Sequence, residues 1–455
     1  MARLFADKAW LADGWRRNVR LTLEAGHIAA LETGAKRAPA DDAVALLVPG
    51  LVNAHSHAFQ RAFAGRSEFR GPAGTDSFWT WREQMYGLAG RIEPRALAAI
   101  AHQAYTEMVA SGYTSVAEFH YLYRDPSDPA VVDAMLAALV EAADASGIRL
   151  IYVPVLYERG GFGGQALSSG QARFALPFDA YVDHAERAAR FLGPAHSLAL
   201  GAHSLRAVTP DSLRRIAALA RERALPMHVH VAEQRLEVED CLAVTGARPV
   251  QWLLDNLDVD ARWCLVHATH LDREELARLA GTGAVVCLCP STEGNLGDGL
   301  FPLAAWLEAG GRMAIGSDSH VTIDPREELR WLEYGQRLQQ EKRNVAAAPD
   351  RGTGARLYSA AVEGGAVAAG LPAGPGIATG MPADLVALDA GCAALAGHSE
   401  ATLLDALLFC GQPSPIERVM VAGAWRVVDG RHATGADTLR RYAATLASLY
   451  DGPGG

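Results

Sequence analysis

Histidines and an aspartate follow short apolar runs that lie far apart along the chain. His55 and His57 follow the run LLVPGLVNA, His230 follows PMHV, His267 follows WCLV, and Asp318 follows MAIGS. Imidazole nitrogens and carboxylate oxygens are common ligands of zinc and iron in enzymes. These residue types, each at the end of a predicted strand, indicate a metal-dependent enzyme.

The spacing of His55 and His57 suits the binding of one ion by both side chains. Residues two apart in a strand point to the same side, so the two imidazoles can face one metal together. A lone H-x-H pair often occurs by chance or for structural reasons. The further metal-type residues at other strand ends favour the functional interpretation.

Glu233 lies three residues after His230, in the segment HVHVAE. A carboxylate beside an activated water can carry a proton from that water to a departing nitrogen. The alternative is an ordinary acidic residue at a helix start. His228 points to the same side as His230 but one layer deeper, where packing is its expected role.

The elements that must bring these residues together are predicted to alternate between strand and helix from residue 46 to residue 375. This alternation is typical of a parallel α/β fold, and eight strands make a closed (β/α)8 TIM-like barrel. The carboxyl ends of its strands meet at one mouth, so distant residues can share one ion. The expected strands are 46–53, 114–118, 149–156, 197–203, 226–231, 263–267, 284–288 and 312–317.

The two ends of the chain are predicted to form a small β-sandwich domain. Residues 1–45 and 376–455 contain short strand-like runs that could not bury a core separately. The catalytic barrel is expected to cover residues 46–375. A final helix is expected at about 437–449.

Composition excludes some functional classes. The chain has 455 residues and a formal net charge of −10, without a basic stripe for nucleic acid. Nowhere in the sequence do about 18 apolar residues run together without a charge or a turn former, and a helix needs about that many to cross a membrane. We therefore expect a cytoplasmic enzyme with no nucleic-acid or membrane partner.

The long segment after His57, residues 58 to 91, is rich in aromatic residues and is expected to cover the barrel mouth. It carries Arg82, and Arg206 follows the fourth predicted strand. Because a guanidinium matches a carboxylate in geometry, two converging arginines suggest a small-molecule dicarboxylate substrate. Each arginine alone could equally be a surface or helix-cap residue.

The four-part pattern of H-x-H, H-x-x-E, a sixth-strand histidine and an eighth-strand aspartate resembles the amidohydrolase superfamily. The resemblance implies that His55, His57, His230 and Asp318 are the metal ligands. It also implies that Glu233 is the proton shuttle, and that His267 and Asp318 polarise the attacking water.

The positions of the lysines bear on the number of metal ions. Many two-metal members of the superfamily bridge their ions with a carboxylated lysine on a barrel strand. This chain has only Lys8, Lys36 and Lys342, none near a barrel strand end. The resemblance therefore implies one divalent ion, as in the deaminase branch, with Zn²⁺ expected and Fe²⁺ also chemically acceptable.

Three local strings, HSHAFQRAFAG, FWTWREQMY and AHSLRAV, resemble the formimidoylglutamate deiminase family. That family hydrolyses N-formimidoyl-L-glutamate to N-formyl-L-glutamate and ammonia in histidine degradation, and the resemblance suggests a homodimer. It implies that the following residues bind the substrate: Gln60, Arg82, Tyr121, His203 and Arg206.

Two alternatives remain open at this stage. A deaminase acting on guanine, a triazine or an adenosine derivative would share the metal residues and differ in the lid and the fourth-strand contacts. A non-catalytic assembly protein on the same barrel is the other alternative, although such proteins have typically lost metal ligands.

Overall fold

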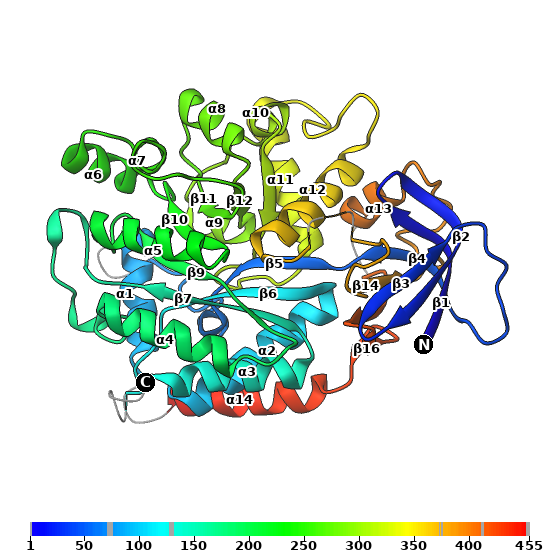
Figure 1. Cartoon of the computed structure of the whole chain (residues 1–455), viewed down its shortest axis with the longest axis horizontal. Coiled ribbons are helices and arrows are strands. Elements are labelled where there is room, and N and C mark those ends of the chain that lie inside the picture. Colours follow the sequence, from blue (N-terminus) through cyan, green and yellow to red (C-terminus); the bar gives the residue numbers. More distant parts are fainter. Residues whose placement is uncertain are drawn as a thin grey trace.

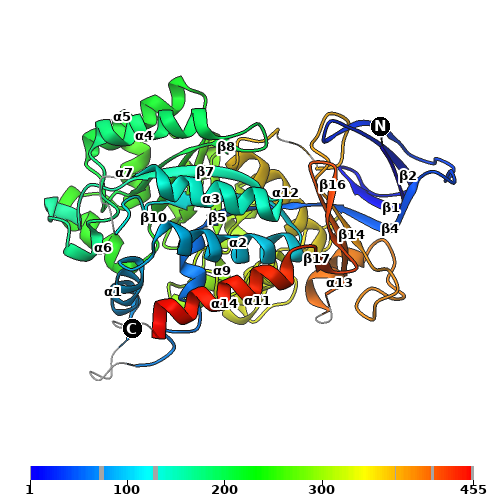
Figure 2. The same ribbon diagram turned by 90° about the horizontal axis from the view of Figure 1, so that it is seen from below.

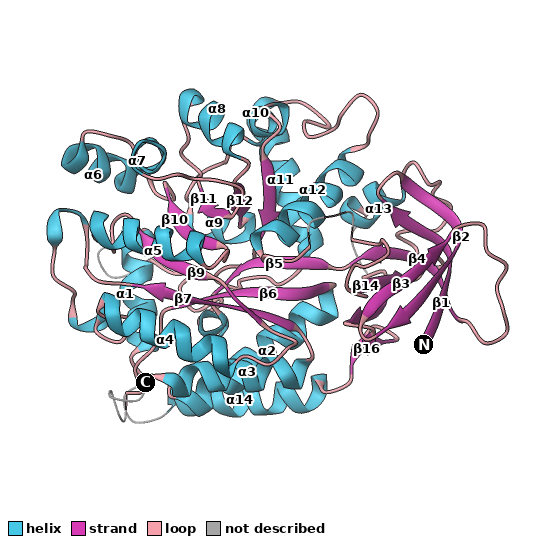
Figure 3. Ribbon diagram, viewed as in Figure 1, coloured by secondary structure: helices cyan, strands magenta, loops and turns pink. Residues whose placement is uncertain are grey.

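Two separate β-sheets organise the chain, as the computed structural model shows (Figures 1 and 3). The structure describes residues 2–70, 76–126, 132–372, 374, 376–410 and 414–451. One sheet closes on itself and the other is built from both ends of the chain.

The closed sheet is a parallel barrel of eight strands, which confirms the predicted fold. β13 pairs with β5, and β6 pairs with both β5 and β7, so the ring has no open edge. The short β8 (Ser197–Leu198) extends the pairing of β7 just before β9. The barrel strands are β5 (Leu51–Ser56), β6 (Tyr113–His120), β7 (Arg149–Leu156), β9 (Leu200–Ser204), β10 (Met227–Val231), β11 (Trp263–His267), β12 (Val285–Leu288) and β13 (Arg312–Ile315).

Helices surround the barrel, so its strands are buried on both faces and read as nearly continuous apolar runs such as RLIYVPVL in β7. Two helical elements, η1 (Ala58–Ala62) and α1 (Phe78–Ala89), follow β5 at the carboxyl end of the barrel. The other helices of the barrel region are α2 (Pro94–Ser111), α3 (Asp133–Ser146), η2 (Phe162–Gly164), η3 (Ser169–Gln171), α4 (Phe178–Phe191), α5 (Pro210–Glu222), α6 (Arg235–Thr245), α7 (Pro249–Asn256), α8 (Arg273–Thr282), α9 (Pro290–Leu296), α10 (Leu303–Glu308), α11 (Pro325–Gln340) and α12 (Thr353–Ala368).

The terminal sheet has the strand order β17-β16-β15-β14-β4-β1-β2-β3. β4 and β14 pair antiparallel at its centre and thereby join the two ends of the chain. Leu21, Leu47 and Leu385 belong to its own apolar core. Its strands are β1 (Ala2–Leu11), β2 (Gly14–Glu24), β3 (His27–Glu32), β4 (Asp42–Pro49), β14 (Leu385–Leu388), β15 (Ile416–Val421), β16 (Ala424–Val428) and β17 (Arg431–His432), and α13 (Leu403–Phe409) lies between β14 and β15.

The first predicted strand, 46–53, is in fact divided between the two sheets. β4 crosses the boundary expected at residue 46 and belongs to the terminal sheet, whereas β5 begins the barrel. Gly50 separates them, and a Cβ there would lie only 2.3 Å from the Thr114 side chain. β4 therefore ends at Pro49, and the missing side chain of Gly50 allows the backbone to pass close to Thr114 before β5 begins.

The last helix, α14 (Gly435–Asp451), also departs from the expected division of the chain. The sequence assigns this helix to the small domain of residues 376–455, but it packs along α2 on the outside of the barrel (Figure 2). The phenol of Tyr442 donates to the carbonyl of Arg61, and that of Tyr450 donates to the carbonyl of Ala62, both at 2.9 Å. Residues 452–455 of that predicted domain lie outside the described residues.

Candidate active site

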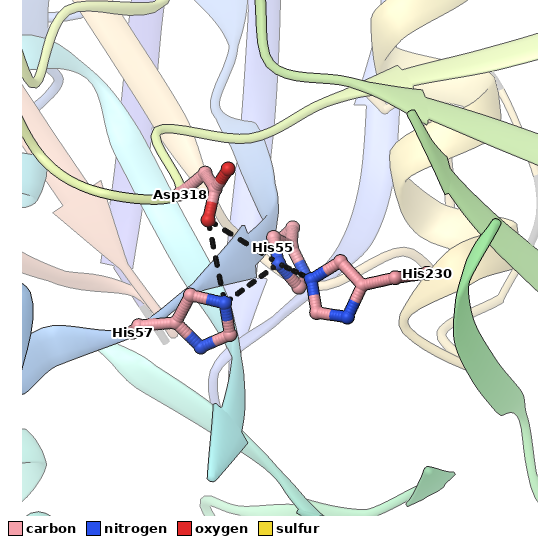
Figure 4. A group of neighbouring side chains, drawn as sticks. All are labelled: His55, His57, His230 and Asp318. Atoms are coloured by element: carbon pink, nitrogen blue, oxygen red, sulfur yellow. Dashed lines mark hydrogen bonds and ion pairs between the residues drawn. The ribbon is translucent and has the colours of Figure 1, made fainter. Parts of the chain in front are cut away.

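Four of the predicted metal-binding side chains converge at the carboxyl end of the barrel (Figure 4). His55 Nε2 lies 3.1 Å from His57 Nε2 and 2.9 Å from His230 Nε2. Asp318 Oδ1 lies 3.3 Å from His57 Nε2 and 3.5 Å from His55 Nε2. Ligands bound tetrahedrally at about 2.0–2.1 Å would stand roughly 3.3 Å apart, so the spacing suits one zinc-sized ion.

The hydrogen bonds on the far side of the imidazoles decide which nitrogens carry lone pairs. His57 Nδ1 lies 2.9 Å from the carbonyl of Phe119, and His230 Nδ1 lies 3.0 Å from the carbonyl of His203. A carbonyl only accepts, so each Nδ1 is protonated and each Nε2 directs a lone pair at the centre. A buried cation satisfies these lone pairs, and the donor set therefore fits a divalent metal.

Burial keeps the three imidazoles neutral. Desolvation lowers the pKa of His57, and it lowers the pKa of His55 and of His230 well below the usual histidine range. The neighbouring histidines add to the effect at His55 and His230. Neutral imidazole is the form that binds a metal.

The backbone around Asp318 and His267 adopts conformations that are rare for residues with a side chain. Asp318 has a φ of 47° and His267 a φ of 69°, both in the left-handed region. Such conformations cost free energy and persist where surrounding contacts hold them, as they often do at functional sites. Here they turn both side chains toward the same centre.

His267 and Glu233 lie next to this cluster. His267 Nε2 is 3.7 Å from both Glu233 Oε1 and Asp318 Oδ2, and its Nδ1 is 3.2 Å from Glu293 Oε1. Burial opposes the charged form of His267, but Glu233, Glu293 and Asp318 together raise its pKa to about 10. Burial raises the pKa of Glu233 to about 7, although His267 opposes this rise.

A cavity opens onto the cluster and is lined by all five predicted substrate-binding residues. Gln60 lies on η1, Arg82 on α1, and Tyr121 just after β6, whereas His203 and Arg206 belong to or follow β9. The structure thus brings together residues that the sequence spreads over nearly 150 positions.

The two arginines have unpartnered donors in this cavity. Arg82 Nε and one of its terminal nitrogens, and one terminal nitrogen of Arg206, are buried without a hydrogen-bond partner. Trp79 lies between them, with its ring centroid 4.5 Å from the Arg82 guanidinium carbon and 5.6 Å from that of Arg206. Because unmet donors in a buried place are costly, the cavity is suited to an anion.

Gln60 and Tyr121 form a second polar contact in the cavity. The Gln60 amide donates to the Tyr121 hydroxyl at 3.1 Å, while Gln60 Oε1 is buried and unpartnered. The open carbonyl oxygen can accept from an N–H group of a bound molecule.

The sequence analysis did not identify three further residues at the site, Tyr86, Tyr157 and Glu293. Tyr86 and Tyr157 line the cavity, and both hydroxyls accept from the buried Gln171, at 3.3 and 2.8 Å. Glu293 on α9 holds His267 and also accepts from the backbone N–H of Cys289 at 2.9 Å. The position of Glu293, four residues after Cys289 at the end of a predicted strand region, is a signal in the sequence that could have indicated it. Nothing in the sequence distinguishes the two tyrosines from other aromatic residues.

Sequence comparison places the whole chain in one family. The profile described as "Amidohydrolase family" matches residues 46–426, and the profile described as "Formimidoylglutamate deiminase HutF, N-terminal domain" matches residues 1–44. The formimidoylglutamate deiminase of Pseudomonas aeruginosa is 48% identical and covers 99% of this chain and 100% of its own. The chain belongs to the formimidoylglutamate deiminase family of amidohydrolases.

Solved structures agree with this family. A structure described as an amidohydrolase from Brucella melitensis is 41% identical, with a TM-score of 0.93, and covers 99% of this chain and 100% of its own. A zinc-bound adenosine deaminase from Xanthomonas campestris is 22% identical, with a TM-score of 0.81, and covers 99% and 98% of the two chains. The second likeness shows the fold alone. The cluster of this chain lies at the carboxyl end of the barrel, which is where TIM-barrel enzymes have their active sites.

Proposed function

We propose that this chain is a metal-dependent deiminase that hydrolyses N-formimidoyl-L-glutamate to N-formyl-L-glutamate and ammonia, a step of histidine degradation. One observation carries the proposal: the buried donors of Arg82 and Arg206 that lack hydrogen-bond partners share a cavity with His57, His230 and Asp318 of the cluster. The substrate has two carboxylates for the arginines and one hydrolysable amidine. The relative from Pseudomonas aeruginosa carries the name of this activity.

A single divalent ion would be held by His55, His57, His230 and Asp318, and we propose zinc, with ferrous iron as the alternative. When bound, such an ion supplies a water that ionises near neutral pH, since it lowers the pKa of water from about 16 to about 7. The convergent Nε2 lone pairs of His57 and His230 support this assignment.

Glu233, His267 and Asp318 are proposed to manage the protons. Water adds to the formimidoyl carbon while a neighbouring group takes its proton, and the carbon–nitrogen bond then breaks as the leaving nitrogen gains a proton. Glu233, whose pKa is raised to about 7, can both accept and release a proton at neutral pH. Glu293 holds His267 at 3.2 Å and so orients its other nitrogen toward Glu233 and Asp318.

The remaining cavity residues are proposed to hold the substrate. Arg82 and Arg206 take the carboxylates, and Gln60, Tyr121 and His203 contact the formimidoyl group and the glutamate portion. Burial lowers the pKa of His203 well below its usual range, helped by Arg206, so this histidine is neutral and can accept a hydrogen bond. The two arginines would orient the substrate through its carboxylates without touching the bond that breaks.

The test is ammonia release by purified enzyme whose metal content has been measured. N-Formimidoyl-L-glutamate should be turned over, with N-formyl-L-glutamate appearing in equal amount, while guanine, 8-oxoguanine and adenosine should not. The last three represent other deaminases, because an 8-oxoguanine deaminase of Pseudomonas aeruginosa is 28% identical and covers 95% of this chain. Turnover of a purine with no turnover of the dicarboxylate would refute the proposal.

We also propose that the enzyme is a cytoplasmic homodimer. Among the described residues, no helix has the length and apolar character needed to cross a membrane. Light scattering after size-exclusion chromatography measures the oligomeric state, and cell fractionation measures the location.

A further inference from the structure

A buried chain of polar side chains lies behind the metal-type cluster and contributes nothing to the cavity. It runs from β5 and β6 to the loop after β13, and its members are almost completely inaccessible. Neither the proposed mechanism nor substrate binding uses these residues. The chain consists of Asn53, Ser56, Glu118, Ser317 and His320.

The direction of each hydrogen bond can be worked out from one end. Ser56 Oγ donates its only proton to Glu118 at 2.6 Å, so the same oxygen must accept from His320 Nε2, 3.1 Å away. At the other end, Asn53 Nδ2 donates to Ser317 Oγ at 2.6 Å, and the backbone N–H of Ser317 donates to Asn53 Oδ1 at 3.0 Å. This pair of bonds settles the orientation of the Asn53 amide.

His320 connects the two ends. Its Nδ1 lies 2.9 Å from Ser317 Oγ. If His320 is neutral with its proton on Nε2, the Ser317 hydroxyl donates to Nδ1 and every donor in the chain meets an acceptor. A doubly protonated His320 would leave the buried Ser317 hydroxyl proton without an acceptor in the chain, which costs free energy.

The chain touches the segments that carry the metal-type residues from both sides. Glu118 accepts from Ser56 Oγ and, at 2.7 Å, from the backbone N–H of Ala58, so it holds both neighbours of His57. On the other segment, Ser317 directly precedes Asp318, and His320 follows it by two residues. The backbones of the two segments are also joined directly, because Asp318 donates to the carbonyl of His55 and His57 donates to the carbonyl of Asp318, both at 3.1 Å.

These contacts hold a backbone conformation that is unfavourable for residues with a side chain. Asp318 and His320 have φ values of 47° and 61°, in the left-handed region that residues with a Cβ rarely adopt. Such a conformation persists only where surrounding contacts over-determine it. The chain ties His320 to β5 and Ser317 to Asn53 on both sides of Asp318.

We propose that His320 and Glu118 are positioning residues of the metal site, acting through a one-directional hydrogen-bond chain that sets the separation of the H-x-H pair from Asp318. The inference rests on the metal-dependent function proposed above. Groups behind metal ligands of this kind typically contribute 10- to 100-fold to metal affinity or activity, an order-of-magnitude expectation.

The test measures zinc affinity of the folded protein by competition with a chelator, without any substrate. His320→Ala should weaken zinc binding about 10- to 100-fold and change the visible absorption of the cobalt-substituted protein, which reports ligand geometry. His320→Gln should recover part of the affinity, because its amide can still donate to Ser56. Glu118→Gln should weaken binding too, because Ser56 and Ala58 donate to different carboxylate oxygens and the amide nitrogen that replaces one of them cannot accept.

Matched controls separate positioning from loss of packing. His120→Ala removes an equally buried histidine outside the chain, and Ser146→Ala removes a buried hydroxyl at the end of α3. Both should keep the zinc affinity and cobalt spectrum of the wild type. If His320→Ala does not fold, Ser56→Ala decides, because it deletes one oxygen and breaks the chain at its middle.

Unchanged zinc affinity and an unchanged cobalt spectrum in His320→Ala, or in Ser56→Ala if the first variant does not fold, would overturn the inference. A double variant adds a further check, since members of one chain should show less than additive losses. Because only zinc and cobalt are used, failure of this inference is distinguishable from failure of the proposed substrate.

Discussion

Burial raises the pKa of Glu233 to about 7; Asp318 adds to this rise, whereas His267 and Arg206 oppose it. Glu233→Gln keeps the shape but cannot carry a proton. We expect kcat to fall by about 10²- to 10⁴-fold, the usual contribution of general acid–base catalysis, with little change in KM. Steady-state kinetics on N-formimidoyl-L-glutamate measures both constants.

The control for this prediction is Glu239→Gln, which makes the same change at an exposed position of α6 and should leave kcat unaltered. A loss confined to KM in Glu233→Gln would contradict its role as proton shuttle.

Arg206 is the residue for which the opposite kinetic pattern is expected. It is buried, and one of its terminal nitrogens has no hydrogen-bond partner, although Glu237 forms an ion pair with that nitrogen at 3.9 Å. Arg206→Ala should lower kcat/KM by about 10- to 150-fold, mainly through KM, because a hydrogen bond to a charged group is worth about 1.5–3 kcal/mol. Arg206→Lys should recover little, since an ammonium lacks the planar fork. Substrate analogues that each lack one carboxylate test which carboxylate Arg206 binds. Arg206→Ala should reduce kcat/KM least on the analogue that lacks that carboxylate.

From the sequence, single residues can be placed together where chemistry and position coincide, and their role as metal ligands stays a prediction. His55, His57, His230 and Asp318 each follow an apolar strand, so residue type and strand end point to one place, and the structure brings their ligand atoms within 4.8 Å of one another. Tyr86, Tyr157 and Gln171 could not be selected in this way. They lie on α1, after β7 and on η3, and only the packed structure shows that both tyrosines line one cavity and that Gln171 donates to their hydroxyls.

At the scale of elements, α14 and η1 are joined more directly than the sequence suggests. Tyr442 and Tyr450 on α14 donate to the carbonyls of Arg61 and Ala62, and Arg66 lies 3.7 Å over the Tyr450 ring. The turn they hold carries Gln60 and directly follows His57. The periodic pattern of the last helix predicts the helix itself, but not the surface against which it packs.

We therefore expect Tyr442→Phe combined with Tyr450→Phe to raise KM several-fold while zinc content and kcat change little. Each lost hydrogen bond should also lower the free energy of unfolding by about 0.5–1.5 kcal/mol. Kinetics and urea unfolding measure the two effects. Thr445→Val is the control, because the half-buried Thr445 hydroxyl donates to the carbonyl of Arg441 within the same helix. Equal effects in both variants would show that the helix acts only through overall stability.

For the molecule as a whole, Asp42 links strands from the two ends of the chain. It accepts from both terminal nitrogens of Arg418, at 2.8 and 2.9 Å, and from Trp425 Nε1 at 2.8 Å. The Arg418 hydrogen bond, helped by Trp425 and opposed by burial, holds the pKa of Asp42 below its usual value. An aspartate with a lowered folded-state pKa adds stability above its unfolded pKa of about 3.9, and this stability is lost as the pH falls further.

Asp42→Asn should accordingly be less stable than the wild type at neutral pH by about 0.2–1 kcal/mol, because the pair is partly exposed. The difference should shrink below about pH 4, where the wild-type carboxylate also becomes protonated. Urea midpoints between pH 3 and pH 7 measure it. The exposed Asp13, paired with the nearby Arg16, provides the control variant Asp13→Asn, which should leave the urea midpoint at neutral pH almost unchanged.

Metal removal also acts on the whole molecule, because an ion that binds only the folded chain stabilises it. Chelation should abolish activity and lower Tm, and one equivalent of zinc per chain should restore both. Elemental analysis with thermal unfolding measures this effect. Activity in protein shown to be metal-free would contradict the role proposed for the four-residue cluster.

The pairing of β4 with β14 has a consequence for biosynthesis. β4 is made early, whereas its neighbour Leu385–Leu388 emerges only after the complete barrel has been translated. Until then one border of β4 displays unsatisfied amide and carbonyl groups, a template for association with other nascent polypeptides. Fragments produced by premature stop codons ahead of Leu385 should therefore precipitate or be degraded rather than accumulate as free barrels.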